Sequence, residues 1–154
     1  MHFSTFTDYS LRVVMYLGLR RERLTTISDI AHSYKISENH LMKVVHHLAR
    51  LGFVETIRGN KGGMRLARAP ENINLGELIR HTEGGGGLLP CLDTKSPCCI
   101  QPSCDMIRIL REAQDALYAV LDRYSLADLL LNDAALSKIL HRDLRKVDVI
   151  VDPR

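Results

Sequence analysis

Four cysteines lie within 14 residues of this chain, and their spacing suits metal chemistry. Cys91, Cys98 and Cys104 form a C-x6-C-x5-C pattern, and Cys99 adds a thiol beside Cys98. Three thiolates can hold an iron–sulfur cluster while one iron is left short of a ligand. An iron with an open coordination position is what a sensor of a small reactive molecule requires. The segment therefore predicts an iron–sulfur centre.

Other uses of these thiols agree less well with the spacing. Structural zinc sites usually pair their cysteines as C-x2-C and close the shell with four ligands, and that pairing is absent. Thiol-redox enzymes commonly rely on a low-pKa C-x-x-C pair, which is also absent. Adjacent cysteines rarely bind one metal, so either Cys98 or Cys99 is expected to be a bystander. A zinc-stabilised adaptor without a sensing role stays open as an alternative.

Length and composition are those of a small globular protein. The chain has 154 residues, of which 45% are hydrophobic and 25% charged, which fits one compact unit with or without an oligomerisation arm. No apolar run approaches the roughly 18 residues needed to cross a bilayer, and residues 1–12 do not resemble a signal peptide. We therefore expect a cytoplasmic protein with no membrane partner, where cysteines more often bind metals than form disulfides.

Positive charge is concentrated in the first half of the chain. Residues 1–70 contain 11 Lys and Arg against 5 Asp and Glu, whereas residues 71–154 contain 10 against 13. The overall net charge of +3 conceals this asymmetry. A basic surface attracts an anionic partner, and nucleic acid is the usual candidate. Uneven surface charge without a partner is the alternative.

Helical periodicity predicts three helices in the first 50 residues. The first is expected over residues 8–21 with Thr7 as its N-cap, because apolar residues recur there at helical spacing. A short second helix is expected to start at Thr26 or Ser28, and a third is expected over residues 38–50. Two short helices joined by a tight turn are typical of a helix-turn-helix.

A β-hairpin is expected directly after the third helix. Residues 53–57 and 64–66 have the composition of short strands, and residues 58–63 between them are rich in Gly, which tolerates the positive φ of tight turns. A further helix is expected over residues 73–82, with Asn74 as a cap. A hairpin that follows a helix-turn-helix is a wing, so this part of the chain is predicted to be a winged helix.

The third predicted helix has an apolar face, formed by Leu41, Val44, Val45 and Leu48, and a polar face with donors for base edges and phosphates. The hairpin adds Arg and Lys side chains that suit a narrow minor groove. Such a face is often only solvated, but its place in a winged helix indicates binding to double-stranded operator DNA. The candidate DNA-binding residues are Ser28, Ser37, Asn39, His40, Lys43, Arg58, Asn60, Lys61 and Arg65, with Thr5, Thr7 and Tyr9 as weaker candidates for phosphate contacts.

A long helix is expected to begin at Asp105 and to mediate dimerisation. Its apolar residues alternate in steps of four and three, which is the pattern of a coiled-coil seam. A single helix with such a seam needs a partner, so we expect a homodimer, with packing inside the chain as the alternative. Two short helices are expected after it, over residues 125–131 and 135–141. The seam residues are Met106, Leu110, Ala113, Leu117, Val120 and Tyr124.

Together these elements predict a mainly α fold with a small β-hairpin wing. Residues 1–70 form the winged helix-turn-helix and residues 71–104 a short helix and the cysteine loop, which opens at four consecutive glycines. Residues 105–154 form the dimerisation helix, the C-terminal helices and a tail. The candidate metal ligands thus lie between a DNA-binding unit and a dimerisation helix.

Five segments resemble the Rrf-type winged-helix transcriptional regulators. They are residues 6–12 (FTDYSLR), 37–43 (SENHLMK), 58–66 (RGNKGGMRL), 98–104 (CCIQPSC) and 124–129 (YSLADL). In combination they are specific, and they are most similar to the nitric-oxide-sensitive repressors of that family. The resemblance implies that the chain is not an enzyme.

The resemblance also implies a set of cluster ligands. Cys91, Cys98 and Cys104 would hold a 4Fe–4S cluster, in preference to a 2Fe–2S cluster, and Asp8 from the other subunit would complete its coordination. Arg12 would couple this site to the rest of the protein. The helix macrodipole also favours a carboxylate near the start of a helix, which gives Asp8 a structural role. This role is compatible with ligation of the cluster.

Two features of the cysteine loop depart from the family members that this chain matches. Cys99 is an additional thiol, and the gap after Cys91 is six residues instead of five. Cys98 is preferred to Cys99 as a ligand because residues 100–103 then align without a gap. Members that regulate cluster biogenesis use a His three residues after the last cysteine, where this chain has Ile107.

The function that the resemblance implies is that of a homodimeric repressor. Nitric oxide would act on the cluster, and nitrosylation or loss of the cluster would release the operator DNA. The alternative within the family is a sensor of redox state, iron or cluster supply. The more distant alternative is the zinc-stabilised DNA-binding adaptor.

Overall fold

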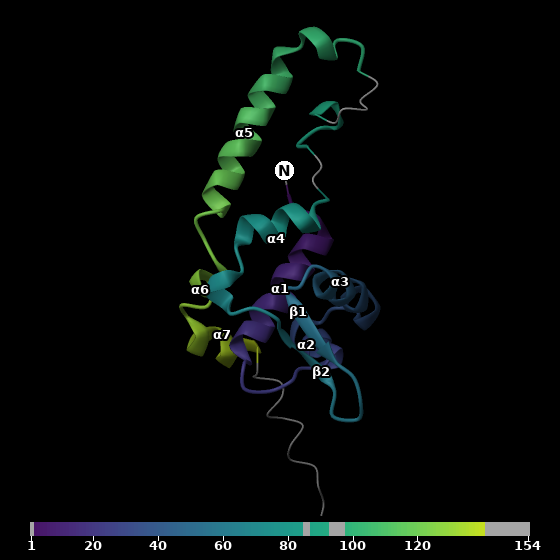
Figure 1. The fold of residues 1–154 in the computed structure, drawn as a ribbon, viewed down its shortest axis with the longest axis vertical. Helices are drawn as coiled ribbons and strands as arrows, with labels where there is room; N and C mark the ends of the chain where they lie inside the picture. Colours follow the sequence, from purple (N-terminus) through teal and green to yellow (C-terminus); the bar gives the residue numbers. More distant parts are fainter. Residues whose placement is uncertain (1, 85–86, 93–97, 141–154) are drawn as a thin grey trace, which may run out of the picture.

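A computed structural model describes residues 2–84, 87–92 and 98–140, which form a winged helix and a long helical arm (Figure 1). Short 3-10 turns lie at Pro70–Asn72, Pro90–Leu92 and Gln101–Ser103. The mainly helical fold with a two-stranded hairpin confirms the predicted fold class. The helices and strands are α1 (Thr5–Leu19), α2 (Ile27–Tyr34), α3 (Glu38–Arg50), β1 (Val54–Ile57), β2 (Gly63–Leu66), α4 (Leu75–Thr82), α5 (Asp105–Leu121), α6 (Leu126–Leu129) and α7 (Asp133–Leu140).

The first helix, α1, begins earlier than the sequence indicated. Ser4 is its N-cap and accepts a hydrogen bond from the Thr7 amide at 3.2 Å. Thr7, the predicted cap, lies inside the first turn, is fully buried and donates to Thr82 Oγ1 at 2.8 Å. Thr7 is therefore also wrong as a phosphate contact. Ser and Thr are both good caps, and packing against α4 decides between them here.

The helix-turn-helix, α2 and α3, agrees closely with the prediction. Thr26 caps α2 through a capping box with Asp29, and Lys35 has a φ of 55° in the turn before α3. The bounds of α3 are those predicted. Its four predicted core residues are buried in the hydrophobic core that α3 shares with α1. That packing directs the opposite face of α3 to solvent.

The wing is the antiparallel hairpin of β1 and β2, in which Val54 lies opposite Leu66 and Ile57 opposite Gly63. Gly59 at its tip has a φ of 116°, which a residue with a side chain adopts only with strain. Near the start of β2, Met64 is buried and forms a β-bridge with Thr25. The wing is thus fastened to the segment that joins α1 to α2.

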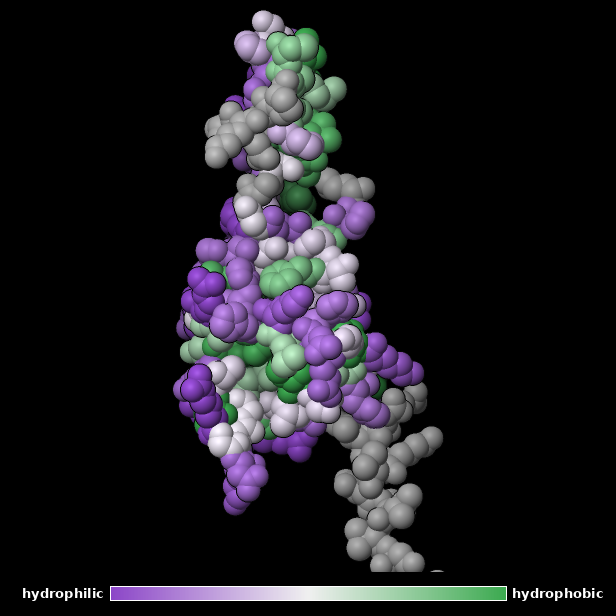
Figure 2. Space-filling model, turned by 90° about the vertical axis from the view of Figure 1, so that its right-hand side faces the viewer, coloured by the Kyte–Doolittle hydropathy of each residue, from purple (hydrophilic) through white to green (hydrophobic). Residues whose placement is uncertain are grey.

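The long helix α5 stands away from the winged helix, and the cysteine segment passes beside its far end (Figure 1). One side of this arm is hydrophobic (Figure 2). Met106, Ile109 and Val120 are its exposed large apolar residues and form what we call the α5 stripe. Ile109 lies outside the predicted seam, and α5 ends at Leu121, before Tyr124, the last residue of the predicted seam.

The last two helices, α6 and α7, follow the arm. Ser125 caps α6 through a capping box with Asp128, and Leu126 is buried against α1. The final predicted helix extends to His141, which lies outside the described residues together with the tail. None of the described helices is both long enough and apolar enough to span a membrane.

Candidate metal centre and DNA-binding surface

The cysteine segment is held to the start of α5 by main-chain hydrogen bonds. Gln101 donates from its side chain to the Cys91 carbonyl at 3.0 Å and from its amide to the Cys98 carbonyl at 3.2 Å. Cys104 is the N-cap residue of α5, so the longest helix sets its position. Gln101 therefore connects the two ends of the segment, although residues 93–97 between them lie outside the described part.

The four thiols are available for coordination. None of them forms a disulfide; Cys91 and Cys104 are half-buried, whereas Cys98 and Cys99 are exposed. Among residues 2–84, 87–92 and 98–140, no three His, Cys, Asp or Glu side chains are close enough together to hold a metal ion. The donor set nevertheless fits an iron–sulfur cluster, because thiolates are the soft ligands such clusters use. The described part of a single chain does not preform the site.

Asp8 lies on the first turn of α1 and pairs with Arg12 one turn later. The Asp8 Oδ1 to Arg12 Nε distance is 3.0 Å, and the Asp8 side chain is 48% exposed. The Arg12 guanidinium also lies 5.4 Å from the centre of the Tyr34 ring, and burial raises the pKa of Tyr34 to about 12. Arg12 thus connects Asp8 to α2, while the half-exposed carboxylate stays accessible to a second chain.

The outward face of α3 carries the predicted DNA-reading side chains. Asn39, His40 and Lys43 are all exposed, and the His40 ring lies 6.3 Å from the ring of Tyr9 on α1. Ser37 occupies the N-cap position of α3, but its side chain makes no capping hydrogen bond. Its hydroxyl therefore does not serve the helix end. Ser28 is exposed on α2.

The wing presents its basic residues to solvent. Arg58, Asn60 and Lys61 are exposed at the tip. Arg65 is also exposed, but its Nε lies 2.9 Å from Glu55 Oε2, its cross-strand neighbour. Arg65 is thus partly neutralised, while Arg58 and Lys61 have no ion pair among those described.

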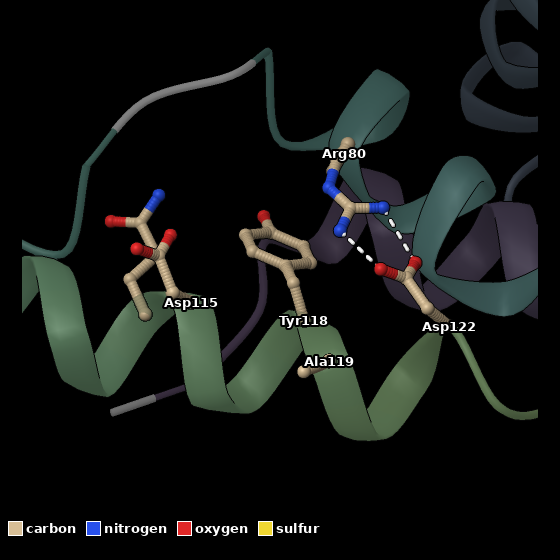
Figure 3. Close-up of a pocket in the computed structure, with 6 residues that line it drawn as sticks. Arg80, Asp115, Tyr118, Ala119 and Asp122 are labelled. Atoms are coloured by element: carbon tan, nitrogen blue, oxygen red, sulfur yellow. Dashed lines mark hydrogen bonds and ion pairs between the residues drawn. The ribbon is translucent and has the colours of Figure 1, made fainter.

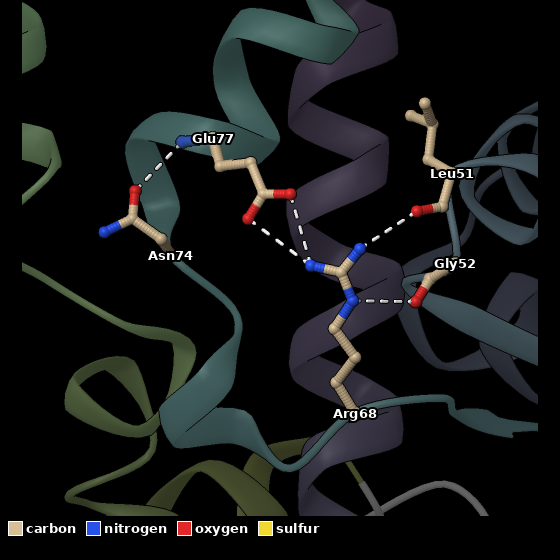
Figure 4. Close-up of polar contacts among 5 residues, drawn as sticks. All are labelled: Leu51, Gly52, Arg68, Asn74 and Glu77. Carbon is tan, nitrogen blue, oxygen red and sulfur yellow. Dashed lines mark hydrogen bonds and ion pairs between the residues drawn. The ribbon is translucent and has the colours of Figure 1, made fainter.

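Arg68, which the sequence did not single out, joins the end of α3 to α4 (Figure 4). It donates to the main-chain carbonyls of Leu51 at 3.1 Å and Gly52 at 3.0 Å, directly after α3. It also donates to Glu77 at 3.2 Å, and its guanidinium lies 4.6 Å from the centre of the Phe53 ring. These contacts fix the orientation of α4 relative to α3.

A second junction joins α4 to the end of α5 (Figure 3). The Asn74 amide, at the N-cap of α4, donates to the Asp122 carbonyl at 2.7 Å. The Asp122 carboxylate accepts two hydrogen bonds from Arg80 on the last turn of α4. Arg80 lies over the Tyr118 ring, 4.4 Å from its centre. A Cβ at Gly76 would collide with the Asp122 carboxylate, so a larger residue there would have to displace the side chain that Arg80 holds.

The two junctions form one polar path from α3 to α5. Asn74 Oδ1 accepts a hydrogen bond from the Glu77 amide at 2.9 Å, and the Glu77 side chain pairs with Arg68. No sequence pattern predicts these partners, which are separated along the chain by up to 48 residues in the case of Asn74 and Asp122.

The end of α4 is also joined to the start of α1. Glu83 accepts hydrogen bonds from the amide of Ser4 at 2.8 Å and from its hydroxyl at 3.0 Å. Burial opposes ionisation of Glu83, but the hydrogen bonds from the Ser4 amide and hydroxyl help to hold the pKa of the carboxyl below its ordinary value. Glu83 directly precedes the cysteine loop and holds Ser4, which lies one turn before Asp8. This contact therefore fixes the start of α1 relative to the beginning of the loop.

Comparisons with known proteins identify the kind of regulator that this arrangement resembles. A family model described as Rrf2, iron-dependent transcriptional regulator, matches residues 3–132. The HTH-type transcriptional regulator NsrR of Bacillus licheniformis is 47% identical over 142 residues, which cover 91% of this chain and 99% of that protein. NsrR of Bacillus subtilis is also 47% identical, over 91% of this chain and 97% of that protein.

Solved structures share the fold. CymR of B. subtilis, described as a global cysteine regulator, has a TM-score of 0.64 and 31% identity, and covers 84% of this chain and 95% of its own. IscR of T. potens has a TM-score of 0.69 and 26% identity, with coverage of 86% and 88%. Both are regulators, and neither comparison points to catalysis.

Proposed function

This chain belongs to the Rrf2 family of iron-dependent transcriptional regulators, and we propose that it is a repressor that uses an iron–sulfur cluster to respond to nitric oxide. As a member of that family it is a DNA-binding regulator and not an enzyme. The finer assignment rests on the similarity to NsrR proteins, which extends over 91% of the chain.

The observation that carries the proposal is the cysteine segment. Cys91, Cys98 and Cys104 are free of disulfides, and Gln101 connects the carbonyls of the first two just before the third begins α5. We assign these three thiols as ligands of a cluster, with 4Fe–4S favoured over 2Fe–2S. When bound, the cluster supplies an iron atom whose remaining coordination position can be taken by a small molecule.

Asp8 of the partner subunit is proposed to occupy that remaining position. In the described part of a single chain, Asp8 is not grouped with the cysteines, and its carboxylate is half-exposed. Carboxylate oxygens are hard ligands and bind soft iron–sulfur sites weakly, so Asp8 would yield readily to a competitor. Arg12 would hold the carboxylate in place until then.

The α5 stripe is the proposed dimer contact. Met106, Ile109 and Val120 expose 44–52% of their surface, and apolar side chains at helical spacing on an exposed face are typical of helix pairing. Antiparallel pairing through α5 would bring the cysteine end of one subunit near the winged helix of the other. A homodimer is also what a palindromic operator requires.

The proposed DNA contacts follow from the exposed faces of α3 and the wing. Asn39, His40 and Lys43 would enter the major groove, and Arg58 and Lys61 would track phosphates or the adjacent minor groove. Ser28, Ser37, Asn60 and Arg65 are assigned supporting contacts. Arg65 would contribute less charge than its neighbours because it pairs with Glu55.

Coupling between the metal centre and the DNA-binding surface would pass through the polar path from α5 to α3. Ligation by Asp8 would fix α1 relative to the partner's α5, and the path through Asp122, Glu77 and Arg68 would carry the position of α5 to the end of α3. Release of Asp8 would then change the separation of the two recognition helices. Cluster state and DNA affinity must be linked reciprocally if this is correct.

The deciding experiment is metal analysis combined with DNA binding. Protein purified without oxygen should contain iron and sulfide, absorb visible light and shift operator DNA, and added nitric oxide should abolish the shift. Zinc without iron would support a zinc-stabilised adaptor and contradict the proposal. Iron and sulfide with a DNA shift that responds to oxidants or iron supply, but not to nitric oxide, would instead support another sensor of the family.

A further inference from the structure

Met42 is an exposed apolar side chain on the polar face of α3. It is 49% exposed. Asn39 lies one turn before it and His46 one turn after it on the same face, and both are exposed. Lys43, the adjacent residue, is exposed as well. The residue at the centre of the proposed DNA-reading face is therefore hydrophobic.

Met42 is not part of the hydrophobic core of the winged helix. The buried face of α3 consists of Leu41, Val44, Val45 and Leu48, and Met42 is not among the partly buried residues that pack against the core. About half of its side chain is exposed, and exposed apolar surface is unfavourable in water. A partner that removes this surface from water would account for it.

Exposed large apolar side chains are rare elsewhere in the winged helix. Within the described residues 2–84, Phe3, Met42 and Ile57 are the only ones. Phe3 lies before α1, whereas Met42 and Ile57 lie on α3 and on the wing, the two elements proposed to contact DNA. Figure 2 views the molecule from the side where α3 and the wing lie in Figure 1, and hydrophobic residues are visible there among hydrophilic ones. Two of these three exposed apolar side chains thus lie on the proposed interface.

We propose that Met42 recognises thymine by packing against its 5-methyl group in the major groove. The inference rests on the proposed placement of α3 in that groove. Thymine is the base that presents a methyl group there, and the methionine side chain is long, unbranched and polarisable, which lets it adapt to such a group. Asn39 and Lys43 would bind the polar edges of neighbouring bases, so Met42 would act as a specificity-determining residue.

Ile57 provides a matched control. It is also an exposed apolar residue of the DNA-binding unit, at 36%, but the wing is assigned to phosphates and the minor groove. The minor groove presents no thymine methyl group. Replacement of Ile57 should therefore not alter the response of the protein to removal of a methyl group.

The test uses full-length protein loaded with its metal and DNA in which thymine is replaced by deoxyuridine, which lacks only the methyl group. An operator is first selected from random duplexes, and each thymine is then replaced in turn. Wild-type protein should lose about four-fold in affinity for each buried methyl group that is removed, at one position of each half-site. Met42→Ala should bind thymine and deoxyuridine duplexes equally, whereas Met42→Leu and Ile57→Ala should keep the wild-type difference.

The inference is overturned if no replacement weakens wild-type binding, or if Met42→Ala keeps the full penalty. The thymine scan uses wild-type protein, so its outcome does not depend on whether a variant folds. Met42→Gln is a second variant, which replaces the apolar side chain with a polar one of similar size. Failure to select any duplex would defeat the DNA-binding assignment itself. A selected operator without a methyl effect would defeat only the role of Met42.

Discussion

Arg80 and Asp122 join the last turn of α4 to the end of α5 through two hydrogen bonds of 2.6 Å each. The hydrogen bonds from Arg80 also hold the pKa of Asp122 below its ordinary value. Because Asn74 donates to the carbonyl of the same residue, Asp122 contacts both ends of α4. Asp122 is therefore a central residue of the junction that orients the arm.

Asp122→Asn is predicted to weaken the link between metal state and DNA affinity. The amide cannot accept two charge-assisted hydrogen bonds from Arg80, which are the stronger kind. The ratio of operator affinities with and without the metal should fall about five-fold, the low end of coupling between sites. Anaerobic gel shifts with loaded and metal-free protein measure that ratio.

Glu112→Gln is the matched control for this change. Glu112 pairs with Arg108 within α5 at 3.7 Å and joins no second element. Its replacement should leave the affinity ratio unchanged. Equal effects of the two substitutions would show that loss of any ion pair on α5 matters, and would contradict a specific role for Asp122.

Single cysteine replacements should separate the ligands from the bystander. Cys91→Ala, Cys98→Ala and Cys104→Ala should each abolish the visible absorption of the cluster, because each removes a thiolate bond. Cys99→Ala should keep most of it. Absorption spectra and iron content per chain measure the outcome, and bleaching by Cys99→Ala with a coloured Cys98→Ala protein would reverse the assignment of these neighbours.

Asp8→Ala should separate metal loading from DNA binding. Three thiols would remain to hold the cluster, but no carboxylate would reach across the dimer. Operator affinity of the loaded variant should fall toward that of metal-free protein, while the dimer persists in analytical ultracentrifugation. A loaded Asp8→Ala protein with wild-type affinity and wild-type response to nitric oxide is incompatible with ligation across the dimer.

Replacement of wing residues should change the salt dependence of DNA binding. Arg58→Ala and Lys61→Ala should each reduce the log–log slope by about one unit for every phosphate that the variant no longer neutralises. Arg65→Ala should have a smaller effect, because its charge is already paired with Glu55. Titrations at several salt concentrations give the slopes, and an unchanged slope in the Arg58/Lys61 double variant would remove the wing from the interface.

Glu83→Gln should change how stability depends on pH. The folded-state pKa of Glu83 is below its ordinary value of 4.5, so its charged form stabilises the fold above that pH and the benefit is lost as the pH falls through the folded-state pKa. Wild-type protein should therefore unfold at a higher temperature than the variant at pH 7, and the difference should shrink as the pH falls below 4.5. Exposed Glu22→Gln is the control, and a pH-independent difference for Glu83→Gln would contradict the account.

Local patterns predicted the elements that carry function better than the contacts that orient them. The bounds of α3 and its buried face follow from helical periodicity, and Asn74 was identified as a cap because capping is a local interaction. Ser4 and Thr7 were not distinguished, since a contact with Thr82 on α4 decides between them. Arg68 and Asp122 were missed because their partners are remote along the chain and follow no repeat. The exposure of Met42 was not predicted either, because an apolar residue within a helical pattern does not by itself indicate a position on the solvent-facing side.

The attachment of α5 at Asp122 makes the helix a lever. Its 17 residues correspond to a length of about 26 Å, with Cys104 at the far end and the junction with α4 near the pivot. A tilt of about 10° at the pivot moves the far end by roughly 4.5 Å. The same geometry works in reverse: a displacement of a few ångströms at the cysteines becomes a small rotation of the winged helix. The response of DNA binding to the metal centre would then depend on how rigidly the contacts at Asp122 hold the end of α5 against α4.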